Sequence, residues 1–321
     1  MLFRSTVRTR EDIFVMARTK PGDGRKQRAL FTKRLAVAGS HHFEPKSATL
    51  DDLVFLPANL SRLVIDPYRD ACTVETVLGG GALELDAPFL VTGFDDAPDE
   101  VRAAVAHGVR SRRLAYVGRR PLADDVPWLQ LVGAGDSVDA RAEAVIAVGG
   151  DLPWAPEPAR EGQPVGVATS SAGVAAAVPF ALDRGLEFLL LDGTGGAGAG
   201  TAWPELAGAP DLTAIRDTIR VMRALNREED LEILWFGGVR SGTDVVKLLG
   251  LGADAAAVGV GLALAVGGRI EDGSVAWYGD VTLEERSEQA ELYLQALRAE
   301  ASIMPRCTGK TNIHTRSTKC Q

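Results

Sequence analysis

Cysteine, histidine and long apolar runs are scarce in this sequence, and each scarcity excludes a class of protein. Three cysteines without a CxxC pair exclude a disulfide framework and favour a reducing cytoplasm. There are four histidines, and the pair His41 and His42 lacks the ligand spacing of a metal site. The apolar runs contain glycine and are shorter than the ~20 residues that cross a bilayer, and no secretory signal is visible. We therefore expect a cytoplasmic protein without membrane contact.

Charge is distributed unevenly along the chain. The first 34 residues hold ten Lys or Arg against three Asp or Glu, although the net charge of the chain is −8. The basic arm has no helical basic stripe and few aromatic residues, and an acidic body repels phosphate backbones, so we expect no nucleic-acid binding. We expect the arm to dock on its own body or on a neighbouring subunit, in an oligomer or a heteromeric complex.

Short apolar or β-branched segments recur from residue 89 onward, and each ends in small or polar residues. Continuous hydrophobicity is typical of parallel strands that are buried on both faces. Helical patterns lie between most of the segments and again at residues 283–301. The expected strands are residues 89–94, 114–118, 129–133, 145–150, 165–170, 188–193, 233–238 and 255–259.

This succession predicts an α/β protein built on a (β/α)8 TIM barrel. A doubly wound open sheet is the alternative, because the gap between the second and third strands is too short for a helix and its turns. We expect residues 1–88 to form the basic arm and an extension packed outside the barrel. Residues 89–268 are expected to form the barrel, and residues 269–321 a C-terminal helix and tail.

Glycine-rich stretches follow the last two expected strands, at the end where TIM barrels carry their chemistry. Gly237, Gly238 and Gly242 let backbone N–H groups approach an anion, and Gly259 and Gly261 open a short helix. Donors from two adjacent loops and a helix N-terminus favour a phosphate site. The alternative is that these glycines only permit close packing of helices.

A third glycine-rich stretch, DGTGGAGAG at residues 192–200, fits the GxGxxG pattern of dinucleotide-binding folds. That fingerprint opens directly into a helix, whereas TAWPE follows here and the next helical pattern begins near residue 211. No Gly-Lys-Ser/Thr ends the stretch, so it is not a P-loop. We interpret it as a backbone nest at the barrel mouth, able to lie against a planar or anionic ligand.

These stretches resemble the FMN-binding barrel of the large chain of glutamate synthase and its shorter stand-alone relatives. DGTGGAGAG and FGGVRSGTDVVKLLGLGADAAAVG at residues 236–259 carry the resemblance, which extends to residues 51–69 and 304–314. It implies an FMN-dependent oxidoreductase in amino-acid metabolism, whose flavin passes electrons to the imine formed from 2-oxoglutarate and ammonia. We therefore expect FMN as cofactor, and imine reduction or amine oxidation on a small amino or keto acid.

The resemblance also implies which residues hold the cofactor. Thr92 and Gly93 would lie beside the flavin, and Asp192 with the glycines after it would form the wall near flavin and substrate. The remaining positions would surround the phosphate. The expected cofactor-binding residues are Thr92, Gly93, Gly193, Gly195, Gly196, Gly237, Gly238, Arg240, Ser241, Gly242, Gly259, Val260 and Gly261.

Three polar residues are the candidates for chemistry. Asp192 closes the sixth expected strand, Asp95 follows the first, and Arg120 follows the second. Asp95 is either an acid/base group or the approach to a helix N-terminus. Arg120, with its neighbour Arg119, either binds a carboxylate bidentately or belongs to a solvated surface pair.

Two departures from the family pattern leave other functions open. Residues 165–171 contain no cation where the family has a lysine, and residues 267–286 lack the cysteines of the family's iron–sulfur cluster. No such cluster is therefore expected. One alternative is a non-catalytic or flavin-holding barrel that works in a complex with a glutaminase-like or electron-donor partner. Another is an isomerase that holds a substrate phosphate in the same loops.

Overall fold

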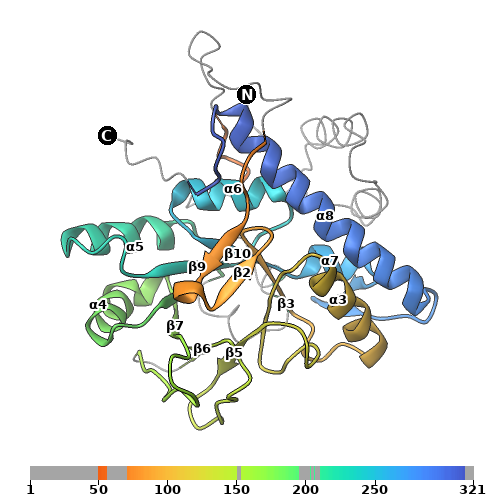
Figure 1. The fold of residues 1–321 in the computed structure, drawn as a ribbon, viewed down its shortest axis with the longest axis horizontal. Helices are drawn as coiled ribbons and strands as arrows, with labels where there is room; N and C mark the ends of the chain where they lie inside the picture. The colour runs from red at the N-terminus through yellow and green to blue at the C-terminus, as the bar shows by residue number, and fades with distance from the viewer. Residues whose placement is uncertain are drawn as a thin grey trace.

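A closed barrel of eight parallel strands forms the centre of the molecule (Figure 1). The structure, a computed structural model, describes residues 50–55, 71–149, 153–194, 203, 206 and 210–314. Because the sheet closes on itself, the prediction of a TIM barrel is confirmed and the open-sheet alternative is excluded. Each barrel strand overlaps one of the eight predicted segments. The strands are β3 (Phe89–Thr92), β4 (Tyr116–Gly118), β5 (Trp128–Val132), β6 (Ala144–Ala147), β7 (Val165–Ser170), β8 (Phe188–Asp192), β9 (Glu232–Phe236) and β10 (Ala255–Val258).

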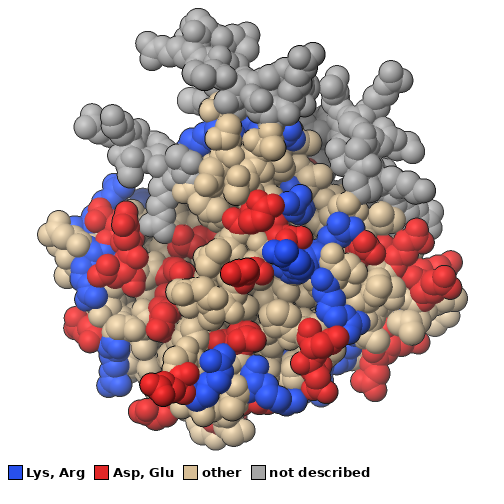
Figure 2. Space-filling view, in the orientation of Figure 1, with Lys and Arg blue, Asp and Glu red and all other residues tan. Residues whose placement is uncertain are grey.

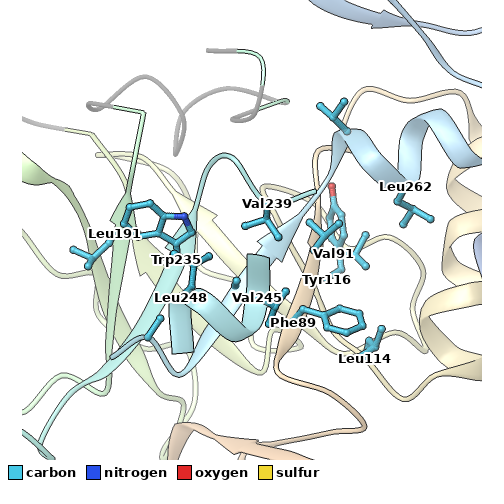
Figure 3. Packing of buried hydrophobic residues seen from close by; sticks show 14 of the residues in the cluster. Phe89, Val91, Leu114, Tyr116, Leu191, Trp235, Val239, Val245, Leu248 and Leu262 are labelled. Carbon is cyan, nitrogen blue, oxygen red and sulfur yellow. The ribbon is translucent and has the colours of Figure 1, made fainter. Parts of the chain in front are cut away.

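The strands are largely apolar because both of their faces are buried. Outward-facing residues such as Phe89, Val91 and Trp235 pack into a large cluster against the surrounding helices (Figure 3). Alternate residues point inward and fill the barrel, among them Leu90 and Phe188. This period of two decides which residues reach the mouth of the barrel at the carboxyl ends of its strands.

A hairpin of β1 (Thr76–Leu78) and β2 (Leu83–Leu85), joined by the 3-10 turn η2 (Gly79–Gly81), closes the other end of the barrel. Leu78, Leu83 and Leu85 join the inner apolar cluster, and Figure 1 shows β2 lying across the barrel. Gly79 has a φ of 62° and donates its N–H to Glu232 Oε2 at 2.8 Å. The hairpin at residues 76–85 of the expected N-terminal extension therefore plugs the barrel floor.

Replacing Glu232 with glutamine is expected to raise the unfolding temperature at pH 8 and to change it little near pH ~4. Burial raises the pKa of this carboxyl, Asp254 and Glu187 add to the rise, and the Gly79 N–H opposes it. Because the folded state prefers the protonated acid, its contribution to stability is lost as pH rises from the unfolded pKa through the raised one. Glutamine keeps the acceptor for Gly79 without the charge.

The measurement is the melting temperature against pH for the Glu232 variant and for Glu84→Gln, which changes an exposed carboxylate on β2. The Glu84 variant is expected to follow the native curve at every pH. A Glu232 variant that is less stable than the native chain at pH 8 would show that the charge of Glu232 stabilises the floor.

Helices surround only part of the barrel. No helix follows β4, β5 or β6 in the described residues. The last barrel strand, β10, is followed by α7 and α8. Of these two helices, α8 packs along α3 (Asp99–Ser111) and α6 (Gly242–Leu251). The expected C-terminal unit therefore contributes the last helix of the outer layer. The helices are α3 (Asp99–Ser111), α4 (Val174–Arg184), α5 (Thr213–Ala224), α6 (Gly242–Leu251), α7 (Val260–Ala265) and α8 (Leu283–Cys307).

Two buried glutamines hold the loops that take the place of the missing helices. The amide of Gln130 donates to Ser137 O at 3.0 Å and accepts the N–H of Asp139 at 2.8 Å. The Gln163 amide nitrogen donates to Asp139 O at 3.0 Å and to Ala142 O at 2.8 Å. Buried backbone groups without a helix or sheet partner are thereby satisfied, which lets loops cover the outer faces of β5 and β6.

A second hairpin, β11 (Arg269–Glu271) and β12 (Ser274–Ala276), lies between α7 and α8 in the chain. None of the described helices combines the length and the apolar character needed to span a bilayer. On the face shown in Figure 2, acidic and basic side chains are interspersed, in keeping with the many exposed ion pairs.

Candidate functional site

Polar side chains occupy the inward-facing positions at the mouth ends of β3, β7 and β8. Inside the barrel, Leu90 on β3 and Leu190 on β8 are apolar, and two residues later on the same faces stand Thr92 and Asp192, which are 4% and 2% exposed. Ser170 on β7 is the partner of Asp192 in the sheet register. The structure thus brings two of the predicted residues, a hydroxyl and a carboxylate, to the same end of the barrel interior.

The carboxylate of Asp192 is held by the loop that follows it. Its Oδ1 accepts the N–H of Thr194 at 2.8 Å and the hydroxyl of the same residue at 2.5 Å. A buried carboxylate at a strand end, supported by such donors, is suited to bind a cationic or proton-donating group. Gly195 and Gly196 lie outside the described residues, so their predicted contact with the flavin stays a prediction.

The loops after β3, β8 and β9 need glycine for different reasons. Gly93 ends β3 with a φ of 97°. Gly193 donates its N–H to Phe236 O at 2.8 Å, and the ring of Trp235 occupies the space that a Cβ at Gly193 would need. The Trp235 indole in turn donates to Gly237 O at 2.7 Å. The β8 and β9 loops are therefore fixed against each other.

The two predicted phosphate loops lie beside each other. Tyr293 on α8 donates its hydroxyl to Arg240 O, after β9, at 3.4 Å. The same hydroxyl fills the space next to Gly261, after β10, that a Cβ would take. Gly237 and Gly238 have φ values of 109° and 69°, and no hydrogen-bond acceptor for their N–H groups is found in the described part of the chain. These amides are suited to hold an anion.

Three of the residues predicted to surround a phosphate have other contacts. The guanidinium of Arg240 binds Asp51 at 2.6 and 3.1 Å and Asp244 at 3.1 Å. Burial alone would lower the pKa of Arg240, and the two carboxylates outweigh it and raise that pKa above its ordinary value. The Ser241 hydroxyl accepts the Asp244 N–H at 3.0 Å and caps α6. Gly242 lies against the backbone of α8.

Arg240, Ser241 and Gly242 thus have structural roles that account for them without a ligand. Arg240 joins the pre-barrel segment at residues 50–55 to α6, and its charge is already balanced by two carboxylates. Their part in binding phosphate stays a prediction, as does that of Gly259, Val260 and Gly261. Asp51 and Tyr293 were not singled out by the sequence, because nothing local marks a residue whose partner lies about 50 or more positions away.

Asp95 and Arg120 make hydrogen bonds that connect the β3 loop to the β4 loop. Asp95 Oδ1 accepts the hydroxyl of Tyr116 at 3.0 Å, and its Oδ2 accepts the N–H of Arg119 at 2.9 Å. Burial, followed by the Asp95 charge, raises the pKa of Tyr116 well above its ordinary value. Arg120 donates to the Asp95 carbonyl and lies 3.5 Å from the carboxylate of Asp96. These contacts are structural, and a catalytic role for either residue stays a prediction.

An aromatic cluster at the mouth was missed by the sequence reasoning. Phe94 after β3 lies 5.3 Å from Trp203 and 6.1 Å from Trp277, measured between ring centroids. The two tryptophans are 6.3 Å apart, so the cluster joins the β3 loop, the segment after β8 and the β11–β12 hairpin. Phe94 and Trp277 come within two residues of a strand end, which was the available signal, whereas Trp203 lies eleven residues after β8 and carried no such mark.

Comparisons with known proteins support the resemblance for the second half of the barrel. Residues 158–272 match the family model described as a conserved region in glutamate synthase. A stretch of 90 residues is 37% identical to the glutamate synthase large subunit-like protein of Rhizobium meliloti (strain 1021). That stretch covers 27% of this chain and 20% of the relative, so the match spans a fifth of the relative's length. The segment from β7 to β11 is therefore glutamate synthase-like.

Solved structures share the fold at low sequence identity. A flavocytochrome b2 mutant with pyruvate bound has a TM-score of 0.55 and 16% identity, and the match covers 97% of this chain and 91% of that one. A mandelate oxidase mutant with a C4a-OH-FMN adduct has a TM-score of 0.50 and 18% identity over 80% and 84% of the two chains. These likenesses confirm the barrel architecture.

Proposed function

We propose that this glutamate synthase-like barrel is a cytoplasmic FMN-dependent oxidoreductase that reduces an imine or oxidises an amine on a small amino or keto acid. The observation that carries the proposal is the match of residues 158–272, because this segment contains the glycine-rich loops after β8, β9 and β10. The structure supports it by placing the β9 and β10 loops beside each other.

The residues at the mouth fit a flavin phosphate through backbone rather than through side-chain charge. Gly237 and Gly238 have N–H groups without an acceptor in the described residues, whereas the Arg240 guanidinium is committed to Asp51 and Asp244. Amide donors bind phosphate without a compensating positive charge. When bound, FMN would supply the hydride chemistry. Asp192 would hold the nitrogen of the substrate through its buried carboxylate.

We expect FMN to bind roughly a hundredfold more tightly than riboflavin, because two hydrogen bonds to a charged phosphate would be lost with riboflavin. The measurement is titration of the purified chain with each flavin, followed by absorbance and flavin fluorescence. A chain that takes up no FMN would contradict the proposal. Equal affinity for FMN and riboflavin would show that the glycine-rich loops do not bind the flavin phosphate. Tighter binding of a phosphorylated sugar than of FMN would favour an isomerase.

Gly238→Ala is expected to lower the affinity for FMN, because a Cβ there would lie 2.5 Å from the ring of Pro210 and displace the loop. Gly273→Ala is the matched control. Gly273 also has a positive φ, 75°, but it sits in the β11–β12 turn with open space around its Cα. The control separates the cost of the backbone conformation, which both variants share, from the displacement of the loop.

A flavin-holding subunit is the second candidate, and a specific observation favours it. The inward-facing positions of β7 are Gly166, Ala168 and Ser170, so this strand offers no cation to stabilise negative charge on a reduced flavin. Catalysis would then require a glutaminase-like or electron-donor partner. Turnover of an amino or keto acid by the isolated chain, with an artificial electron donor or acceptor, would exclude this candidate.

A further inference from the structure

The order of strands places two charged mouth residues across the barrel from each other. In the closed order β10-β3-β4-β5-β6-β7-β8-β9, three strands separate β4 from β8 in either direction. Asp192 ends β8 on its inward face. Arg119 directly follows β4, two residues after the inward-facing Val117. A cation and a carboxylate therefore stand at opposite sides of one mouth.

The backbone of Arg119 is fixed, while its guanidinium is held loosely. Its N–H donates to Asp95 Oδ2 at 2.9 Å. The nearest carboxylate to the guanidinium is that of Asp136, at 3.8 Å, and both side chains are about half exposed, at 50% and 52%. Asp136 Oδ2 accepts the N–H of Gly133, directly after β5, at 2.8 Å. The pair thus sits at the carboxyl ends of β4 and β5.

Two neighbouring arginines, Arg120 in the β4 loop and Arg102 on α3, are committed to protein groups. Arg120 donates to the Asp95 carbonyl and pairs with Asp96. Arg102 donates to the carbonyls of Phe94 and Pro121 at 2.7 and 2.5 Å. Within the described residues, the Arg119 guanidinium makes no hydrogen bond. Its one contact there with a charged group is the ion pair with Asp136 at 3.8 Å. An exposed planar guanidinium in this state is suited to take a carboxylate bidentately.

We propose that Arg119 is the residue that selects a carboxylate-bearing substrate, with its guanidinium binding that carboxylate while Asp192 holds the amine or imine nitrogen across the mouth. The proposal rests on the proposed function for the identity of the reaction. It keeps the small amino or keto acid of the proposed function as the substrate and adds that Arg119, rather than Arg120, recognises the carboxylate of that substrate.

The test is binding of 2-oxoglutarate to the FMN-loaded chain, followed by the change in flavin absorbance and by calorimetry. Arg119→Gln is expected to raise the dissociation constant roughly ten- to a hundredfold, and Arg119→Lys to restore part of the loss. Asp136→Asn removes the internal competitor for the guanidinium, so it is expected to bind 2-oxoglutarate more tightly. Arg113→Gln is the matched control, because Arg113 is an exposed arginine paired with Asp86.

Affinity for FMN is measured separately and is expected to be unchanged in Arg119→Gln. If the native chain takes up no FMN, the proposed function fails, while calorimetry of 2-oxoglutarate binding to the flavin-free chain still tests Arg119. An unchanged dissociation constant in Arg119→Gln, an equal loss in Arg113→Gln, a loss in Arg120→Gln instead, or no binding of 2-oxoglutarate by the native chain at millimolar concentration would each overturn the assignment.

Discussion

Replacing Arg286 with leucine is expected to lower the free energy of unfolding by about 3–5 kcal/mol, the largest effect of any single substitution considered. Arg286 on α8 is fully buried. Its guanidinium donates to Val266 O, after α7, and to Tyr278 O, after β12, at 2.5 Å for the second. Glu100 in the first turn of α3 lies 3.9 Å away. Leucine would leave these carbonyls buried without donors.

The measurement is chemical denaturation of the variant and the native chain. Arg223→Leu is the control, because Arg223 on α5 is exposed and pairs with Glu228 at 3.5 Å; exposed pairs contribute about 0–1 kcal/mol. Hydrogen exchange is expected to rise first in the β11–β12 hairpin, which Arg286 connects to α8. If the two variants lost similar amounts of stability, the buried arginine would not be what holds this hairpin.

Replacing Arg240 with methionine is expected to cost about 3 kcal/mol and to weaken FMN binding. The Asp244 carboxylate, 5% exposed, would keep the N–H of residue 240 at 3.0 Å but lose its guanidinium partner. Asp51 would lose its ion pair with residue 240, which together with the Lys247 ammonium on the Leu50 carbonyl fixes residues 50–55 to α6. Because the β9 loop that carries Gly237 and Gly238 leads directly into this cluster, the amides for the phosphate would lose their support.

Asp51→Asn separates the contribution of Arg240 to stability from its contribution to FMN binding. It is expected to cost less stability than Arg240→Met, since Asp244 still balances the guanidinium, and to leave FMN affinity near the native value. Denaturation and FMN titration of both variants provide the comparison, with Arg216→Met as control for the loss of an exposed ion pair, here with Asp217. Tighter FMN binding by Asp51→Asn would instead show that Asp51 and the phosphate compete for Arg240.

Much of the fold could be predicted from the sequence because its determinants are local. Each strand is a continuous apolar run closed by glycine or a polar residue, and burial on both faces makes such runs visible without knowledge of their neighbours. The end of each run then located Thr92 and Asp192 at the mouth. That the described residues form no helix after β4, β5 or β6 was indicated in the sequence only by the short gap before β5.

The contacts of the site residues could not be predicted in the same way. Asp95 was a candidate acid/base group, but its oxygens meet Tyr116 and the Arg119 N–H, 21 and 24 residues away. Arg240 was a candidate phosphate ligand, but Asp51, 189 residues away, binds it. Hydrogen-bond partners at such separations are set by which strands become neighbours, and no local pattern records them.

The sequence by itself therefore determined the eight strands, the barrel they form and the glycines at its final loops, because burial and backbone freedom leave a mark at each position. Only the tertiary structure decided which charged groups are committed to protein partners and which face the mouth. A guanidinium or a carboxylate is chemically the same in both places, and its availability depends on the atoms that folding brings within about 3 Å.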